Sequence, residues 1–203
     1  HWNQAADPDL LRAQKNGFDW VIDCRGLGAK VSWGDASRSS KDLRGVRGEV
    51  IRLYAPEVKL RRPTRLIHPR YPIYIAPKEN DVYVVGATEI ESDDLSEMSV
   101  RSAMELLSAV YTVHSGFAEA RILEMATQCR PTLKNNLPEI RMQQQKGLSD
   151  LIMINGLYRH GFMIAPAVLD CALQILEKVD SPTALELGLS ITKNMNSHEV
   201  ACA

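Results

Sequence analysis

The sequence lacks the cysteine spacing of a disulfide framework or a zinc site. Its four cysteines, Cys24, Cys129, Cys171 and Cys202, lie far apart and form no CxxC pair. This usage is typical of a reducing compartment. The sequence also contains no signal-peptide pattern, and no apolar run approaches the ~18 residues that a membrane-spanning helix needs. We therefore expect a cytoplasmic protein with no membrane span.

An excess of charge of one sign is absent as well. The 24 Lys and Arg residues nearly balance the 25 Asp and Glu residues, and the formal net charge is -1. This balance argues against a dedicated nucleic-acid or membrane-surface protein. A length of 203 residues suits one full domain or two small ones.

One segment is locally basic, from Arg38 to Arg70. It holds ten basic side chains: Arg38, Lys41, Arg44, Arg47, Arg52, Lys59, Arg61, Arg62, Arg65 and Arg70. Clustered arginines can bind phosphates. Alternate residues of an antiparallel strand also face solvent, where basic side chains are common. Because no aromatic platform is interleaved with the arginines, a solvated strand face is the favoured interpretation and phosphate binding the alternative.

The common catalytic signatures do not occur. We find no GxSxG, HExxH, P-loop or GxGxxG sequence. Gly26-Leu27-Gly28 follows a predicted strand, but Val31 stands where the third glycine of a dinucleotide-binding turn would be. Taken alone, this glycine pair predicts an ordinary turn.

The first two thirds of the chain predict a helix and strand followed by closely spaced strands. A helix after Asp7 and a strand over 18–24 are α/β in character. Strands over 46–54, 64–68, 73–76 and 81–87 have short links, which favours an antiparallel sheet. An apolar stripe from Val100 to Tyr111 predicts an amphipathic helix, with Asp94 and Glu97 placed like a capping box.

The remaining residues predict fewer elements. We expect a strand over 118–129, an irregular loop over 130–140 and a buried strand over 150–156. A helix over 163–176 is apolar nearly all round, and the residues after it are predicted to be mostly a tail.

Five segments together resemble one family. They are "FDWVIDCRGLGA", "LRGVRGEVI", "IYIAPKENDVYVVGATE", "CRPTLKNNLPEI" and "INGLYRHGFMIAP", in this order. The set resembles the FAD-dependent D-amino-acid oxidase family, most closely its glycine oxidase branch of the thiamine-biosynthesis type. In that family an N-terminal segment carries the GxGxxG turn. The resemblance therefore implies that this sequence is the C-terminal part of such a protein and that the missing segment is its partner.

The resemblance also implies an α+β fold. A large antiparallel or mixed sheet with helices on one face would form a substrate-binding domain over 43–147. The C-terminal remnant of a doubly wound FAD-binding domain would comprise 7–30 and 148–178, and 179–203 would be the tail.

The cofactor-binding residues are implied by the same likeness. In the family, the loop matching residues 156–163 packs against the flavin ring, and the next helix directs its N-terminus at the pyrimidine edge, where the helix dipole favours negative charge. Gly156 and Gly161 would allow close backbone approach. The implied contacts are Cys24, Arg25, Gly26, Leu157, Tyr158, Arg159, His160, Gly161, Phe162 and Met163.

Four residues are implied for the substrate. Arg130 and Arg159 would face its carboxylate, Tyr74 would offer a hydroxyl, and Glu89 would line the pocket. The residues alone leave other interpretations open: Arg130 as a surface arginine and Tyr74 as a core aromatic. Leu157 and His160 depart from the family pattern, which bears on the substrate more than on the chemistry.

The implied function is an FAD-dependent oxidase of a small amino acid such as glycine, sarcosine or a D-amino acid. Hydride would pass to flavin N5, the imine would be hydrolysed, and hydrogen peroxide would form. No side chain is assigned as a catalytic base, and no metal site or nucleic-acid partner is expected. The alternatives are a dehydrogenase or modifying oxidase acting on a bulkier amine, or a non-catalytic binding fragment. A homo-oligomer is left open.

Overall fold

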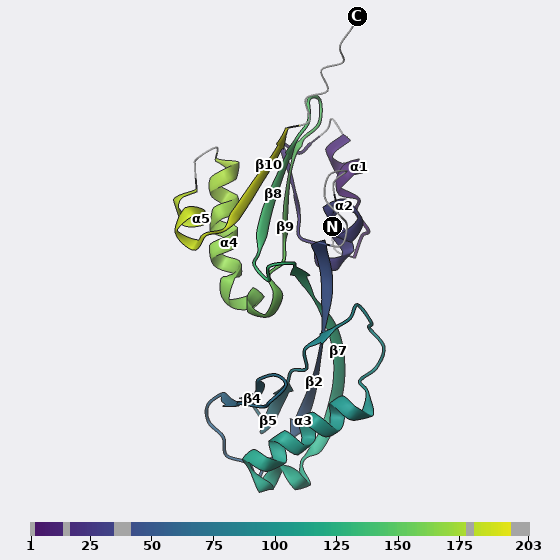
Figure 1. The fold of residues 1–203 in the computed structure, drawn as a ribbon, viewed down its shortest axis with the longest axis vertical. Coiled ribbons are helices and arrows are strands. Elements are labelled where there is room, and N and C mark those ends of the chain that lie inside the picture. The colour runs from purple at the N-terminus through teal and green to yellow at the C-terminus, as the bar shows by residue number, and fades with distance from the viewer. Residues whose placement is uncertain (1–2, 14–16, 35–41, 178–180, 196–203) are drawn as a thin grey trace, which may run out of the picture. The chain divides into compact units, whose positions relative to one another are not determined.

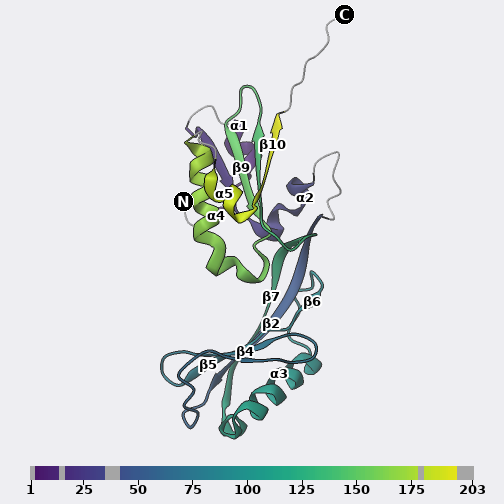
Figure 2. The same cartoon turned by 60° about the vertical axis from the view of Figure 1, so that its left-hand side comes forward.

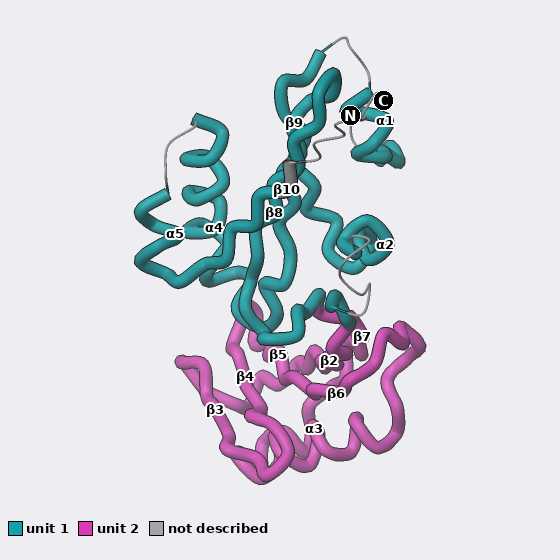
Figure 3. The backbone as a smooth tube through the Cα atoms, turned by 45° about the horizontal axis from the view of Figure 1, so that its top comes forward, with its two compact units in different colours: residues 1–44, 131–203 teal, residues 45–130 magenta. Residues whose placement is uncertain are grey.

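The structure is a computed structural model, and it describes residues 3–13, 17–34, 42–177 and 181–195. The chain divides into two compact units, shown in Figure 3. Unit 1 comprises His1–Arg44 and Pro131–Ala203, and unit 2 comprises Gly45–Arg130. None of the helices in the described residues is long and apolar enough to cross a membrane.

Unit 1 contains a four-stranded sheet with the strand order β1-β9-β8-β10 (Figure 1). Its strands are β1 (Trp20–Asp23), β8 (Glu139–Gln144), β9 (Asp150–Asn155) and β10 (Ser190–Met195). β1 runs parallel to β9, β8 runs antiparallel to β9, and β10 runs parallel to β8. Its helices are α1 (Pro8–Ala13), η1 (Gly26–Ala29), α2 (Lys30–Trp33), η4 (Tyr158–His160), α4 (Gly161–Leu176) and α5 (Pro182–Leu187).

Helices cover both faces of this sheet. Side chains alternate between the faces along β9. Ile152 and Ile154 pack in a buried cluster with residues of α4 and α5, whereas Leu151 and Met153 pack in another cluster with Trp33 of α2. Helices on both faces are typical of a doubly wound α/β domain, although this sheet is mixed because β8 runs antiparallel to β9.

The predicted helix over 163–176 is confirmed as α4, which begins two residues earlier. Its buried residues are confined to one side. Only Val168, Cys171, Ala172 and Ile175 are buried, at the i, i+3, i+4 and i+7 spacing of one helix face. Apart from Asp170 and Gln174 the helix is apolar nearly all round, but the sheet covers only one side of it.

Two segments are more ordered than the sequence predicted. The expected tail contains α5 and β10, because apolar Ile191 and Ala184 pack on the cluster formed by β8, β9 and α4. The expected irregular loop over 130–140 is mostly strand, since β7 continues to Leu133 and β8 starts at Glu139. Its polar turn is confined to the residues between them.

Unit 2 is built on a six-stranded sheet with the order β3-β4-β5-β2-β6, and β7 pairs with β2. The strands are β2 (Leu43–Tyr54), β3 (Thr64–Leu66), β4 (Ile73–Pro77), β5 (Val82–Gly86), β6 (Ile90–Glu91) and β7 (Arg121–Leu133). The pairings of β2 with β5, β3 with β4 and β4 with β5 are antiparallel, as predicted. The two longest strands, β2 and β7, carry the chain from one unit to the other.

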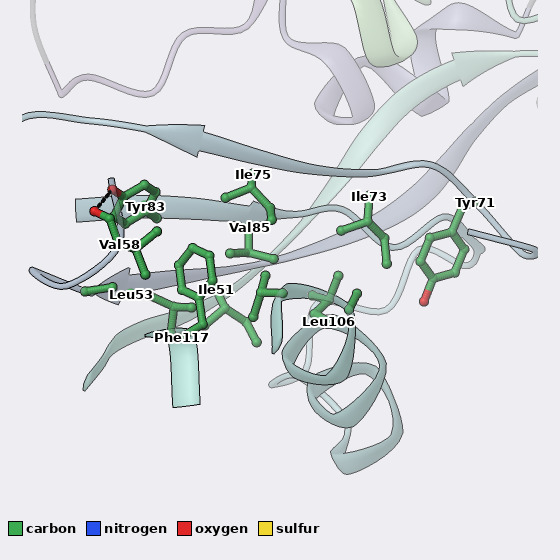
Figure 4. Packing of buried hydrophobic residues seen from close by; sticks show 13 residues of the cluster. Ile51, Leu53, Val58, Tyr71, Ile73, Ile75, Tyr83, Val85, Leu106 and Phe117 are labelled. Atoms are coloured by element: carbon green, nitrogen blue, oxygen red, sulfur yellow. Dashed lines mark hydrogen bonds between the residues drawn. The ribbon is translucent and has the colours of Figure 1, made fainter. Parts of the chain in front are cut away.

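One face of the sheet of unit 2 packs on α3 (Val100–Val113), which Figure 2 shows along that face; η3 (Ser115–Glu119) follows the helix. In Figure 4, Leu106 of α3 points toward Ile51, Ile73 and Val85 of the sheet. Each of these four side chains is fully buried. Burying side chains of this size contributes ~1.5–3 kcal/mol apiece, so this layer stabilises the unit.

The predicted cap of α3 is wrong. Ser99 is the N-cap, and its hydroxyl accepts a hydrogen bond from the Ser102 amide at 3.1 Å. Asp94 and Glu97 instead present their backbone carbonyls to a buried arginine, Arg47. Ser99 and the Asp94–Glu97 pair are both polar residues before the same apolar stripe, so the sequence does not show which of them caps the helix. In the structure, Asp94 and Glu97 contact Arg47 and Ser99 caps the helix.

The compact units and the predicted domains divide the chain at different points. Residues 131–147 were predicted to be part of the substrate-binding domain, but they lie in unit 1, where β8 pairs with β9 and β10. The assignment of unit 1 to FAD and unit 2 to the substrate stays a prediction.

Candidate active site

Two predicted cofactor-binding loops meet at one edge of the sheet in unit 1. Cys24, Arg25 and Gly26 follow β1, and residues 157–163 follow β9. β1 and β9 are parallel neighbours, so their carboxyl ends lie at the same edge, which is where α/β sheets bind ligands.

A buried amide connects the two loops. Nδ2 of Asn155 donates to the carbonyl of Gly26 at 2.9 Å, and its Oδ1 accepts from the Gly156 amide at 2.9 Å. The Asn155 side chain is 2% exposed. The sequence analysis did not assign this residue, although a polar side chain that ends a buried apolar strand is a signal that could have revealed it.

The loop after β1 is held by an ion pair. Oδ1 of buried Asp23 accepts from the Arg25 amide and Nε at 3.0 and 2.9 Å, and Oδ2 accepts from Nη2 at 2.8 Å. Burial by itself raises the pKa of Asp23, but hydrogen bonds from Arg25 and its charge outweigh burial, so the pKa lies below the usual value. Burial and the charge of Asp23 raise the pKa of the Cys24 thiol. Arg25 therefore has a structural role besides its predicted contact with the cofactor.

The loop after β9 has a specialised backbone. Gly156 has a φ of +79°, and a β-carbon there would lie 2.7 Å from the Leu133 side chain and 3.0 Å from the Leu137 carbonyl. The need for glycine at 156 thus comes from the chain itself. At Gly161 a β-carbon would make only ordinary contact, 3.4 Å from Leu157. Tyr158 has a left-handed φ of 51°, which is uncommon for a residue with a side chain.

The start of α4 is a helix N-terminus without a side-chain cap. The N-cap residue, His160, makes no side-chain capping hydrogen bond, and the first turn carries no acidic residue. Amides in the first turn of a helix have no partner within the helix. These amides and the helix dipole suit a ligand with negative charge or carbonyl oxygens.

A pocket of about 380 Å³ lies beside this helix start. Leu157, His160 and Met163, three of the predicted cofactor-binding residues, line it together with residues of the 136–138 turn and the 187–189 segment. The volume is within the range of small-molecule sites. Phe162 is fully exposed, and Met163 is 73% exposed. Within the described part of the chain, no group of three His, Cys, Asp or Glu side chains could hold a metal ion.

The guanidinium of Arg130, in unit 2, is hydrogen-bonded to backbone carbonyls. Its Nη1 donates to the Thr88 carbonyl at 3.2 Å and to the Arg47 carbonyl at 3.5 Å. A β-carbon at Gly48 would lie 2.3 Å from Nη2, so the guanidinium occupies the space that a side chain at 48 would need. Arg130 is half-buried, which differs from the surface arginine that the residues alone also allowed.

Tyr74 lies on the sheet face away from the core of unit 2. It is 40% exposed, whereas its neighbours Ile73 and Ile75 are fully buried and point to α3. The guanidinium carbon of Arg65 stands 5.6 Å from the ring centre of Tyr74. The interpretation of Tyr74 as a core aromatic is therefore wrong. Glu89 is also exposed and follows buried Thr88.

The sequence analysis favoured a solvated strand face for the basic segment. The structure shows that not all of its basic side chains are exposed. Arg47 is 5% exposed and pairs with fully buried Glu49 at 2.8 Å. Burial raises the pKa of Glu49, but hydrogen bonds from neighbouring side chains and the charge of Arg47 have the larger combined effect, so the pKa lies below the usual value. Arg38 and Lys41 lie outside the described residues.

The four predicted substrate-binding residues are divided between the units. Arg130, Tyr74 and Glu89 belong to unit 2, and Arg159 belongs to unit 1 with the predicted cofactor contacts. A larger open hollow of about 1030 Å³ in unit 2 is lined by Arg52, Arg61 and Lys78 among others, and none of the predicted site residues lines it.

Comparison with known proteins identifies the family. Residues 5–169 match the model of the DAO family, described as FAD dependent oxidoreductase. The chain belongs to this family. This FAD-dependent oxidoreductase chain is 46% identical over 150 residues to a Rhizobium etli protein named as thiamine biosynthesis oxidoreductase ThiO. That match covers 74% of the chain and 42% of the relative.

A further relative matches in sequence, and solved structures show the same fold. A D-amino acid oxidase of Dugesia ryukyuensis is 30% identical over 118 residues, which is 58% of the chain and 32% of that protein. Glycine oxidase from Bacillus cereus has a TM-score of 0.59 at 23% identity, covering 68% of the chain and 37% of that structure. Iminodiacetate oxidase from Chelativorans has a TM-score of 0.65 at 19% identity, and the match covers 87% of the chain and 47% of that structure. The chain thus spans less than half the length of the proteins it matches.

Proposed function

We propose that the protein containing this chain is an FAD-dependent oxidase of a small amino acid, with glycine or sarcosine as the preferred substrate class. The observation that carries the proposal is the meeting of the two predicted cofactor loops at the carboxyl ends of β1 and β9, in a chain of an FAD-dependent family. The relative named D-amino acid oxidase supports an amino-acid substrate, and the relative named ThiO supports an oxidoreductase.

In this proposal, unit 1 holds the flavin. The first-turn amides of α4 and the loop residues Leu157 to Met163 would hold the ring, and Cys24, Arg25 and Gly26, which follow β1, would hold another part of the cofactor. When bound, the flavin supplies the acceptor for the hydride that leaves the substrate α-carbon, and dioxygen then takes the electrons as hydrogen peroxide. The chain contributes binding, orientation and a positive electrostatic environment.

Arg130 is the proposed partner of the substrate carboxylate. A guanidinium can bind a carboxylate through two parallel hydrogen bonds, and the half-buried seat of Arg130 limits competition from water. Arg159 is a proposed second cation, Tyr74 a proposed hydroxyl donor, and Glu89 a proposed side chain of the substrate pocket. Water hydrolyses the imine product, and no side-chain base is needed if the amine binds without its extra proton.

The experiment is an assay of the complete protein from its gene. We expect a yellow protein with stoichiometric flavin that forms peroxide together with ammonia from glycine, or with methylamine from sarcosine. The 203-residue chain alone is the comparison. Since its sequence lacks the GxGxxG turn that cradles the cofactor phosphates, it should not retain flavin through gel filtration. A complete protein that lacks flavin, or that oxidises no amino acid, contradicts the proposal.

A further inference from the structure

The position of Arg130 depends on the backbone of two segments. One is the Arg47–Gly48 stretch of β2, which supplies a carbonyl and the open space at Gly48. The other is the carbonyl of Thr88, at 3.2 Å from Nη1. Whatever fixes Thr88 therefore fixes one of the acceptors that direct the guanidinium.

Thr88 is fixed by Glu49 through three hydrogen bonds. Its hydroxyl donates to Oε2 of Glu49 at 2.9 Å and accepts from the Glu49 amide at 2.9 Å. Its amide donates to the Glu49 carbonyl at 3.3 Å. Both residues are fully buried, so water does not compete for these bonds.

Glu49 is fixed in turn by Arg47. Oε1 of Glu49 accepts from Nε and Nη2 of Arg47 at 3.2 and 2.8 Å, and the Ser99 amide donates to the same oxygen at 3.4 Å. Arg47 also donates to the carbonyls of Asp94 and Glu97, each at 2.8 Å. The network thus links the segment before α3 to the seat of Arg130.

A contribution to stability is a weak explanation for the buried Arg47–Glu49 ion pair. Removing two charges from water costs several kcal/mol per ion, and a buried ion pair is often no more stabilising than apolar side chains of the same volume. A fully hydrogen-bonded network instead restricts the geometry of the groups it contains. Such a restriction would keep a carboxylate-binding arginine in one orientation. This matters because small displacements of positioning groups are costly to catalysis.

We propose that Thr88 and Glu49 are positioning residues that orient Arg130 for the substrate carboxylate. The inference rests on the proposed function, in which Arg130 binds that carboxylate. Thr88 acts through its carbonyl and Glu49 acts through Thr88; neither side chain touches the substrate.

The test compares three variants of the complete protein. Thr88→Val keeps the shape and removes the hydroxyl, and Thr88→Ser restores the hydroxyl. Thr127→Val in β7 is the matched control, since its hydroxyl is buried and has no hydrogen-bond partner in the described part of the chain. The readouts are KM and kcat for glycine and the calorimetric Kd of glycolate, a carboxylate without the amine.

We expect Thr88→Val to raise KM and the glycolate Kd by about tenfold, with kcat changed by no more than about twofold. Thr88→Ser and Thr127→Val should retain the values of the unmutated protein. An unchanged KM and Kd in Thr88→Val would overturn the proposal. A decrease in kcat that matches the decrease in the fraction of folded protein would also overturn it. If Thr88→Val does not fold, Glu49→Gln must raise the glycolate Kd while Thr88→Ser leaves it unchanged.

The two proposals can fail separately. A protein that oxidises no amino acid but binds glycolate in a Thr88-dependent way refutes the oxidase function and supports the positioning of Arg130. A protein that oxidises glycine with a KM insensitive to Thr88→Val refutes the positioning alone. A protein that binds no glycolate at all refutes Arg130 as a carboxylate site and with it the positioning.

Discussion

The guanidinium of Arg130 occupies the position that a side chain at residue 48 would fill. A β-carbon on Gly48 would lie 2.3 Å from Nη2 and 2.5 Å from both Cζ and Nη1. Distances this short require a displacement, and the flexible end of the arginine is the part that can move. Residue 48 therefore controls where Arg130 points.

Gly48→Ala should displace Arg130 while leaving the fold intact. We expect the KM for a carboxylate substrate to rise about tenfold, whereas the melting temperature changes little because the three nearest atoms all belong to the flexible end of the Arg130 side chain. In Arg130→Ala, where the obstacle is absent, adding Gly48→Ala should cause no further loss. Gly17→Ala is the control, since a β-carbon at Gly17 meets nothing within 4 Å. Additive losses in the double variant would show that the two residues act independently.

Arg130→Ala should impair the use of substrate far more than folding. Truncating one partner of a buried charge pair costs ~2–5 kcal/mol. At tenfold per ~1.4 kcal/mol, kcat/KM should fall roughly 30-fold to several thousand-fold. Arg52→Ala is the matched control, because Arg52 is half exposed in an ion pair with Glu124 and such pairs are worth ~0–1 kcal/mol. Equal kcat/KM values for the two variants would mean that Arg130 does not bind substrate.

Glu89 is expected to set the preference among side chains. If it lines the pocket, its charge disfavours acidic and apolar substrate side chains and tolerates the hydrogen of glycine. We predict peroxide formation from glycine or sarcosine above that from D-glutamate and D-leucine, and a gain for apolar D-amino acids in Glu89→Met. Glu91→Met, which alters an exposed carboxylate two residues away, should leave the preference unchanged. The pocket assignment is wrong if the unmutated enzyme oxidises D-leucine faster than glycine.

Asp23 should make the stability of unit 1 sensitive to acid. Because its folded pKa lies below the usual value, the stabilisation is present above the pKa of the unfolded chain, ~3.9, and is lost as the pH falls through the lower folded pKa. Asp23→Asn should therefore lower the melting temperature near neutral pH, and its difference from the unmutated protein should shrink as the pH falls below about 4. Asp19→Asn, which alters an exposed carboxylate, is the control. A difference that stays constant down to pH ~2 would exclude the ion pair as its cause.

The local pattern of the sequence was sufficient for most of the elements. Strands β4 and β5, helix α4 and the apolar stripe of α3 match their predictions within two residues, because apolar periodicity and turn residues are properties of neighbouring positions. The family was recognised from the order of five short segments, which also gave the candidate residues of the site. The capping of α3 could not be decided in this way, since Ser99, Asp94 and Glu97 all precede the same apolar stripe.

Burial and long-range contacts were decided only by the tertiary structure. Arg47 is as basic in sequence as Arg52, but one is buried against Glu49 and the other is half exposed. The acceptors of Arg130 lie 42 and 83 residues away along the chain, beyond the reach of any periodic pattern. The sequence by itself determined the family, the main elements and the residues to inspect. The tertiary structure decided which polar groups are buried next to one another. Their burial depends on which faces of β2, β5 and β7 are covered after folding.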